Sequence, residues 1–152
     1  MMAEAADIVL KQIRREDHDS WYPLWRGYQA FYKVDIAKEV SATTFERLLD
    51  PKEPVNGTLA WQGSRAVGMV HYIEHRSTWT VGNYCYLQDL FTSPDLRGGG
   101  VGRKLIEHVY AVAKQAGCAR VYWLTHETNE TAMQLYDRIA DKSGFLQYRR
   151  VL

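Results

Sequence analysis

The sequence predicts a single α/β domain over residues 1–152, in which about four helices flank a mixed, mostly antiparallel central sheet. The length is that of one ordinary domain and is sufficient to bury a core. Short apolar runs typical of strands alternate with apolar stripes at helical spacing. Early strands follow one another directly, whereas the later part of the chain alternates strand and helix, as βαβ units do. No repeat, linker or low-complexity run divides the chain.

The first third of the chain is expected to form one strand and two helices. An apolar run predicts the strand at residues 8–13. A helix is expected from Glu16 to about Tyr32, because acidic residues stabilise a helix N-terminus. Ser41 is the expected N-cap of a second helix, which ends at Asp50-Pro51 because the residue before a proline avoids helical geometry.

The remaining elements complete the order β-α-α-β-β-β-α-β-α-β. Gly117 and Gly144 are expected to end the last two helices, since glycine readily adopts the left-handed conformation found there. In chain order we expect strands at 58–61, 66–73 and 84–92, with residues 78–81 continuing the sheet before the turn at Gly82-Asn83, then a helix at about 101–116, a strand at 120–125, a helix from 131 to about 142 and a strand at 146–151.

The composition excludes several functional classes. The 19 basic and 18 acidic residues give a net charge of +1, so there is no electrostatic case for binding nucleic acid or a membrane. The longest uncharged stretch, Ser77–Gln88, is too short to span a bilayer, and the N-terminus lacks the layout of a signal peptide. We therefore expect a cytoplasmic protein. The two cysteines, Cys85 and Cys118, form neither a disulfide framework nor a metal-binding spacing, and no metal is expected.

A glycine-rich turn is the strongest chemical signal. Residues 97–103 (RGGGVGR) follow a predicted strand and precede an amphipathic helix. Glycines allow a ligand to approach the backbone closely, and a helix N-terminus offers unpaired N–H groups, so the turn suits a pyrophosphate. No window fits the GxxxxGK[ST] or GxGxxG motif, which argues against a nucleotide-binding switch. Taken alone, the turn is also compatible with a flexible connection that binds nothing.

Two motifs together resemble one known family. Arg97-x-x-Gly100-x-Gly102 resembles the Q/R-x-x-G-x-G/A signature of the GCN5-related N-acetyltransferase (GNAT) superfamily. Downstream, residues 129–136 resemble its N-x-x-A-x-x-x-Y motif, and the resemblance runs from about Cys85 to Phe145. Residues 84–91 and 121–125 are further similar to a branch that includes yeast histone-, polyamine- and D-amino-acid-type enzymes and diamine acetyltransferases.

The resemblance implies acetyl-CoA as co-substrate and an N-acetyltransferase activity. The preceding strand would be splayed from its neighbour so that its backbone pairs with the pantetheine, while the turn binds the pyrophosphate. Asn129 would bind the pantetheine, although a helix N-cap role is compatible with the same position. The residues assigned in this way to the co-substrate are Leu90, Phe91, Thr92, Arg97, Gly98, Gly99, Gly100, Val101, Gly102, Arg103, Asn129 and Ala132.

Tyr136 and Asp89 are the candidate catalytic residues. By resemblance, Tyr136 protonates the departing thiolate, although a tyrosine that only packs its ring is the alternative. The acceptor must attack as a free amine, and deprotonating an alkylammonium at pH 7 costs about 4.6 kcal/mol. Similar chains carry Glu-Asp where this one has Gln88-Asp89, and Gln88 cannot take a proton. Asp89 is therefore the candidate base, with Glu74, His71 and His75 on the neighbouring strand as alternatives.

The acceptor is expected to be an amine on a small molecule or a peptide: a polyamine, an amino acid or a peptidyl lysine. Aromatic faces and a carboxylate suit a cation. The candidate acceptor residues are Trp25, Tyr28, Tyr32, Glu39 and Gln88. Core packing is the alternative for the aromatic stripe. The expected assembly is a homodimer. A different functional class remains open, in which the same fold holds acyl-CoA as a regulatory ligand without turning it over.

Overall fold

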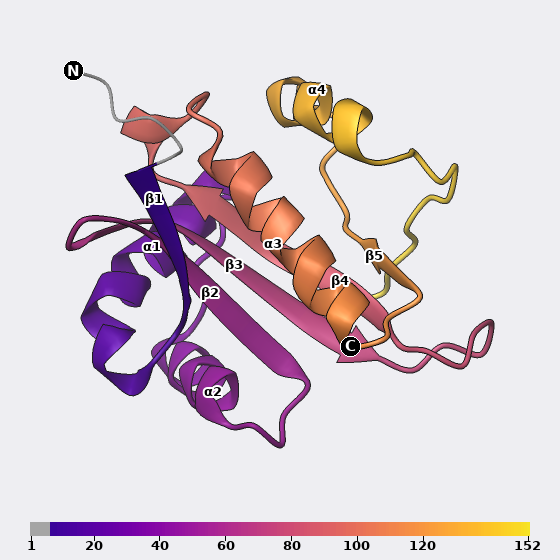
Figure 1. Cartoon of the computed structure of the whole chain (residues 1–152), viewed down its shortest axis with the longest axis horizontal. Helices are drawn as coiled ribbons and strands as arrows, with labels where there is room; N and C mark the ends of the chain where they lie inside the picture. The colour runs from indigo at the N-terminus through magenta and orange to yellow at the C-terminus, as the bar shows by residue number, and fades with distance from the viewer. Residues whose placement is uncertain (1–6) are drawn as a thin grey trace.

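One five-stranded sheet organises the structure, a computed structural model that describes residues 7–152 (Figure 1). The spatial order β1-β2-β3-β4-β5 follows the chain. The first three pairings are antiparallel and the last is parallel. The strands are β1 (Ile8–Gln12), β2 (Val55–Gln62), β3 (Arg65–His75), β4 (Tyr84–Thr92) and β5 (Arg120–Tyr122). The predicted fold class, a mixed and mostly antiparallel sheet flanked by helices, is confirmed.

Helices cover both faces of the sheet. Figure 1 shows α3 (Val101–Gln115) in front of the strands, and α1 (His18–Phe31) and α2 (Lys38–Leu49) behind them. The fourth helix, α4 (Glu130–Ile139), lies near the N-terminal end of α3. Short 3₁₀ helices, η2 (Arg15–Asp17) and η3 (Pro94–Leu96), precede α1 and the glycine-rich turn.

The sheet separates two apolar clusters. On the α3 side the buried members are Ile8, Ala60, Val67, Val70, Tyr72, Cys85, Leu87, Val101, Leu105, Ile106, Val109 and Ala113. On the side of α1 and α2 they are Ile13, Trp21, Leu24, Trp25, Phe45, Leu48, Leu59, Met69 and Phe91. The helical stripe predicted for α1 supplies three of these residues, because its i, i+3 and i+4 positions share one face.

A β-bulge at Gln88 interrupts the pairing of β4 with β3. His71 lies opposite Asp89, but the next residue, Tyr72, lies opposite Leu87, so that Gln88 is extra. An extra residue reverses the alternation of side chains along the strand. Leu87 accordingly packs in the α3 cluster, whereas Asp89 pairs with His71 on the face of α1 and α2.

Two predicted segments of the sheet are wrong. Residues 78–81 form a loop in which Trp79 is 74% and Val81 97% exposed, so these side chains have no core to join. Residues 146–151 have no regular secondary structure, and Leu146 is 82% exposed. An apolar run becomes a strand only where a neighbouring strand accepts its backbone hydrogen bonds, and within residues 7–152 none pairs with this segment.

Several predicted boundaries also shift. Ser41 is not the N-cap of α2, which begins at Lys38; its hydroxyl instead accepts a hydrogen bond from Nε1 of Trp25 at 2.9 Å and links the two helices. The strand predicted at 120–125 ends at Tyr122, and α4 ends at Ile139, before Gly144. Among residues 7–152, no helix combines the length and the apolar character needed to cross a bilayer.

A substitution of Leu105 tests the placement of the core beneath α3. Its side chain is fully buried, so Leu105→Ala removes buried methyl groups and leaves a cavity. We expect the free energy of unfolding to fall by about 2–5 kcal/mol, measured by urea denaturation. The matched control Leu146→Ala removes the same atoms from an exposed position and should change it by no more than about 0.5 kcal/mol. Similar losses in both variants would contradict this placement.

Candidate active site

The glycine-rich turn forms the N-terminus of α3. Gly98 and Gly100 have φ angles of 84° and 86°, a left-handed region in which side chains are strained and glycine is not. Gly100 is the N-cap of α3, and its carbonyl accepts the first helical hydrogen bond, from the backbone N–H of Lys104. The N–H groups of Val101, Gly102 and Arg103 consequently lack partners within the helix. Such a terminus favours an anionic group, through these donors and the helix dipole.

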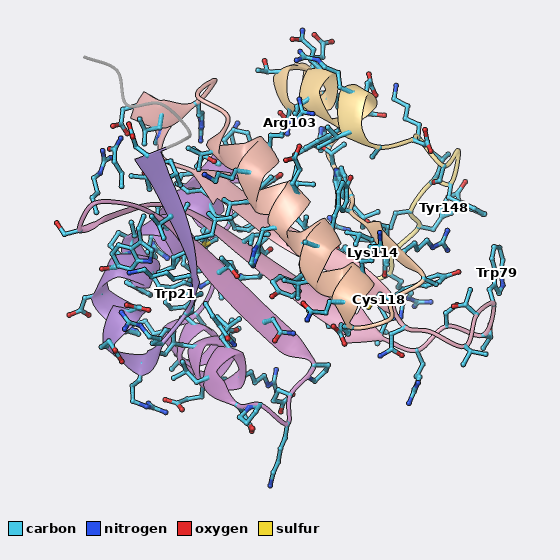
Figure 2. All side chains as sticks on the ribbon, viewed as in Figure 1. Trp21, Trp79, Arg103, Lys114, Cys118 and Tyr148 are labelled. Carbon is cyan, nitrogen blue, oxygen red and sulfur yellow. The ribbon has the colours of Figure 1, made fainter. Side chains whose placement is uncertain are left out.

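Three cationic side chains flank this turn. The guanidinium of Arg97 stacks on the rings of Phe31 and Phe91, with its central carbon 5.3 and 5.4 Å from their centroids. Arg103 lies in the first turn of α3, the end of the helix nearer α4 (Figure 2), and donates to Glu107 at 2.7 Å. Lys104 donates to the carbonyl of Ile8 at 2.9 Å. Arg97 thus connects the turn to α1.

The strands β4 and β5 separate after Tyr86, before β4 reaches this turn. Their parallel pairing covers only residues 84–86 of β4, so the edge of residues 87–92 has no partner strand within the described chain. A small cavity opens where they diverge. The side chains that line it are Tyr28 and Tyr32 from α1, Leu87, Gln88 and Leu90 from β4, Ile106 from α3, Trp123 and Leu124 after β5, and Tyr136 from α4.

Tyr136 lies on the α4 side of this cavity. Its ring meets that of Trp123 edge to face, with centroids 5.3 Å apart. Burial, and secondly the neighbouring Tyr32, raise the pKa of the Tyr136 hydroxyl to about 12. The hydroxyl is therefore protonated at neutral pH, as a proton donor must be.

Asn129 and Ala132 lie near the N-terminus of α4. Asn129 occupies the N-cap position, but its side chain makes no capping hydrogen bond. Its Nδ2 instead donates to Oγ1 of Thr125 at 3.4 Å. Ala132 is half-buried in the first turn of the helix.

A buried polar chain crosses from α1 to β4. The indole Nε1 of Trp21 donates to Nε2 of His71 at 2.9 Å, and Nδ1 of the same imidazole lies 2.9 Å from Oδ2 of Asp89. All three side chains are buried. The bulge at Gln88 makes the last contact possible, since it places Asp89 directly opposite His71.

Three tyrosines lie near Asp89. Burial, and then the nearby carboxylate of Asp89, raise the pKa of Tyr28. Burial and the same charge also raise the pKa of Tyr32 and Tyr86. Tyr28 and Tyr32 are neighbours in one aromatic row, with ring centroids 4.9 Å apart. Asp89 is therefore close to two tyrosines that line the cavity, although it does not line the cavity itself.

The structure brings together many of the predicted site residues, but not all. Tyr28, Tyr32, Gln88, Leu90 and Tyr136 share the cavity. By contrast, Phe91 is buried against α1, and Thr92 lies beside Gly102.

Trp25 and Glu39 do not line the cavity. Trp25 stacks on Tyr28 at 5.5 Å, but its ring is buried and bonded to Ser41. Glu39 is exposed in the first turn of α2. Trp21 and Trp123 were not predicted as site residues. For Trp21 the sequence signal is its place in the stripe of α1, which indicates burial but not a partner.

Comparisons with known proteins decide the family. The model of the acetyltransferase (GNAT) family matches residues 10–140. The D-amino-acid N-acetyltransferase HPA3 of Saccharomyces cerevisiae is 40% identical over 145 residues, covering 94% of this chain and 90% of that protein. The chain belongs to the GNAT family. It is an N-acetyltransferase, an enzyme that transfers acetyl to an amine.

More distant relatives agree with this assignment. The thialysine N-epsilon-acetyltransferase of Bos taurus is 34% identical over 72% of this chain and 55% of its own length. Among solved structures, aminoglycoside N-acetyltransferase AAC(6')-Iy in complex with CoA superposes with a TM-score of 0.82 at 15% identity, covering 95% and 94% of the two chains. A ribosomal-protein-alanine N-acetyltransferase from Brucella melitensis biovar Abortus 2308 gives 0.79 at 17% identity, covering 95% and 99%. These two structures share the GNAT fold.

Proposed function

We propose that this GNAT enzyme, as one domain over residues 1–152, transfers acetyl from acetyl-CoA to a cationic primary amine by direct attack. The acceptor is a polyamine, an amino-acid-like amine or a peptidyl lysine. The observation that carries the proposal is the cavity between β4 and β5, which the protonated Tyr136 lines together with Tyr28 and Tyr32, two tyrosines whose pKa the nearby Asp89 raises. A proton donor and a proton acceptor thus flank one site, as general acid–base catalysis requires.

The co-substrate site follows from the turn and the open strand edge. The free N–H groups at the start of α3 suit the pyrophosphate, and Arg97 and Arg103 add positive charge beside it. The unpaired edge of β4 suits the amides of a pantetheine, which would add to it as an extended strand does. Asn129 makes no capping hydrogen bond, and with its Nδ2 donating to Thr125 its side-chain carbonyl oxygen is left to accept from a pantetheine amide. The bound thioester supplies the activated acetyl group.

The proposed reaction is a single displacement at the thioester carbonyl carbon. Asp89, through water, takes the proton of the acceptor ammonium, and the amine nitrogen then attacks the thioester carbonyl carbon. The new C–N bond forms as the C–S bond breaks, and the nitrogen, which is cationic after the attack, releases its second proton to water. Tyr136 gives its proton to the departing thiolate and regains one from solvent.

The acceptor would meet the aromatic row of α1. Tyr28 and Tyr32 offer ring faces to a cation, Gln88 offers an amide, and the charge of Asp89 lies close to the two tyrosines. These features favour a cationic amine over an alcohol or a nucleic acid. The names of the relatives, D-amino-acid and thialysine acetyltransferases, support a small amine of this kind.

We also propose a homodimer. Exposed apolar side chains beyond α4 support it: Phe145, Leu146, Tyr148 and Val151 are each at least 76% exposed, and Figure 2 shows Tyr148 at the periphery. A second copy would bury them. A monomer in sedimentation velocity at micromolar concentration would contradict this assembly.

Acetyl-CoA should raise the melting temperature, since a ligand that prefers the folded state stabilises it. Gly100→Asp should abolish this shift, because it places a side chain and a negative charge at the anion site. The control is Gly63→Asp in the turn between β2 and β3, where φ is also positive, at 60°. It introduces comparable backbone strain away from the site and should keep the shift. An unchanged shift in Gly100→Asp would contradict the site.

Tyr136→Phe keeps the ring and removes the proton. We expect kcat to fall by about 10²–10⁴-fold while the shift in melting temperature with acetyl-CoA persists. Steady-state kinetics with a saturating amine measures the first, and thermal unfolding the second. Equal kcat in both proteins would show that the thiolate leaves without this proton. A wild type that binds acetyl-CoA but acetylates no amine in a broad panel would instead favour the regulatory acyl-CoA-binding class.

Tyr32→Leu removes an aromatic face from the acceptor side of the cavity. We expect KM for a polyamine to rise by about 2–30-fold, the range of a lost cation–π contact, and KM for acetyl-CoA to stay the same. Glu39→Gln, which changes a residue outside the cavity, is the control and should leave both values unchanged. A KM effect in Glu39→Gln but not in Tyr32→Leu would move the acceptor site to α2.

A further inference from the structure

His71 has both ring nitrogens engaged, and this fixes its proton. An indole N–H donates and never accepts, so Nε2 of His71 must present its lone pair to Trp21 at 2.9 Å. The ring proton is then on Nδ1, from which it is donated to Oδ2 of Asp89 at 2.9 Å. An imidazolium would place two N–H donors head to head at Nε2. The contact with Trp21 therefore excludes the charged form, and His71 has no free lone pair with which to act as a base.

Two indole rings and a glycine face the imidazole from the helix and the strand packed against it. From α1 the rings of Trp21 and Trp25 face it, with centroids 6.1 and 5.2 Å away. From β2 its neighbour is Gly57; a side chain at this position would place its Cβ atom 3.3 Å from the imidazole ring. From β4 it meets Asp89, and Asp89 in turn is near the hydroxyls of Tyr28, Tyr32 and Tyr86.

We propose that His71 is a positioning residue: Trp21 holds it as the neutral, Nδ1-protonated imidazole, and it holds the carboxylate of Asp89 in the orientation that receives the acceptor's proton. The inference rests on the proposed function, because it assigns Asp89 the role of base. The proton moves from the ammonium nitrogen to the carboxylate through water, and then to solvent. His71 keeps its own proton throughout. With His71 neutral, Asp89 is not neutralised by an ion pair and remains able to accept.

The tautomer is testable without any activity. In protein with ¹⁵N-labelled histidine, two-dimensional NMR distinguishes the two neutral imidazoles and the imidazolium. The signal that disappears in His71→Asn identifies His71 among the five histidines. We expect it to remain the neutral Nδ1–H form from pH 5.5 to 8. In Trp21→Phe, which removes the indole donor, Nε2 is free to accept a proton, and the imidazolium form should appear as the pH is lowered over this range. An imidazolium or an Nε2–H tautomer in the wild type would overturn the proposal.

The catalytic consequence is read from the ratio of kcat/KM between variant and wild type, because the ratio cancels the acceptor's own ionisation. For Trp21→Phe the ratio should fall as the pH decreases, since His71 can then become cationic and pair with Asp89. A structural defect alone would lower the ratio equally at every pH. A ratio that does not change from pH 5.5 to 9 would overturn the link between Trp21 and the base.

Replacement of His71 separates hydrogen bonding from packing. His71→Asn retains an N–H donor near the position of Nδ1 and should keep kcat within about threefold of the wild type. His71→Leu fills similar space without a donor and should lose about 10–100-fold, the range for a hydrogen bond to a charged group. Circular dichroism and the acetyl-CoA melting shift verify that both variants fold. Equal kcat in the two would overturn the positioning role.

Asp89→Asn distinguishes this inference from the proposed function. We expect it to lose acetyl transfer but to retain the acetyl-CoA melting shift. If it turned over at the wild-type rate, the role of Asp89 would be overturned even where the tautomer of His71 is the one expected. A failure of wild-type protein to bind acetyl-CoA would instead contradict the proposed function, and the NMR result would remain decisive for the tautomer.

Discussion

One extra residue in β4 decides how the two halves of the site meet. Without the bulge at Gln88, Leu87 and Asp89 would point to the same face, into the apolar cluster beneath α3. With it, Asp89 turns to the opposite face and meets His71. A carboxylate buried among aliphatic side chains would be strongly disfavoured. The bulge therefore converts an unfavourable position into one with a hydrogen-bond donor.

The same strand has two very different edges. Its pairing with β3 extends from Tyr84 to Thr92, whereas its pairing with β5 ends at Tyr86. Bulged strands bend and twist more strongly than regular ones, and the divergence from β5 begins next to the bulge. The cavity, the open backbone edge and the orientation of Asp89 consequently all lie within one short part of β4. The helices α1, α3 and α4 supply side chains to a space that this strand creates.

Local features were predictable from the sequence, and pairings were not. The turn at residues 97–103 and the stripe of α1 depend on neighbouring residues, so their patterns predicted them. The contact of His71 with Asp89 depends on strand register and on a bulge that leaves no mark in the sequence. Strict alternation along β4 gave no reason to pair these two residues. The strand expected at 146–151 fails for the related reason that apolar alternation reports a tendency, whereas a strand also requires a neighbour.

The two apolar clusters have a consequence for how such enzymes diversify. The cluster around Trp21 and Phe45 joins α1 and α2 to one face, while that around Leu105 joins α3 to the other. The sheet lies between them, Arg97 links the glycine-rich turn to α1 through Phe31, and side chains of α1 and α3 line the same small cavity. Substitutions that reshape α1 and α2 therefore leave the packing of α3 largely undisturbed. Under the proposed function, a library confined to those two helices would vary the acceptor side of the cavity while the glycine-rich turn stays constant.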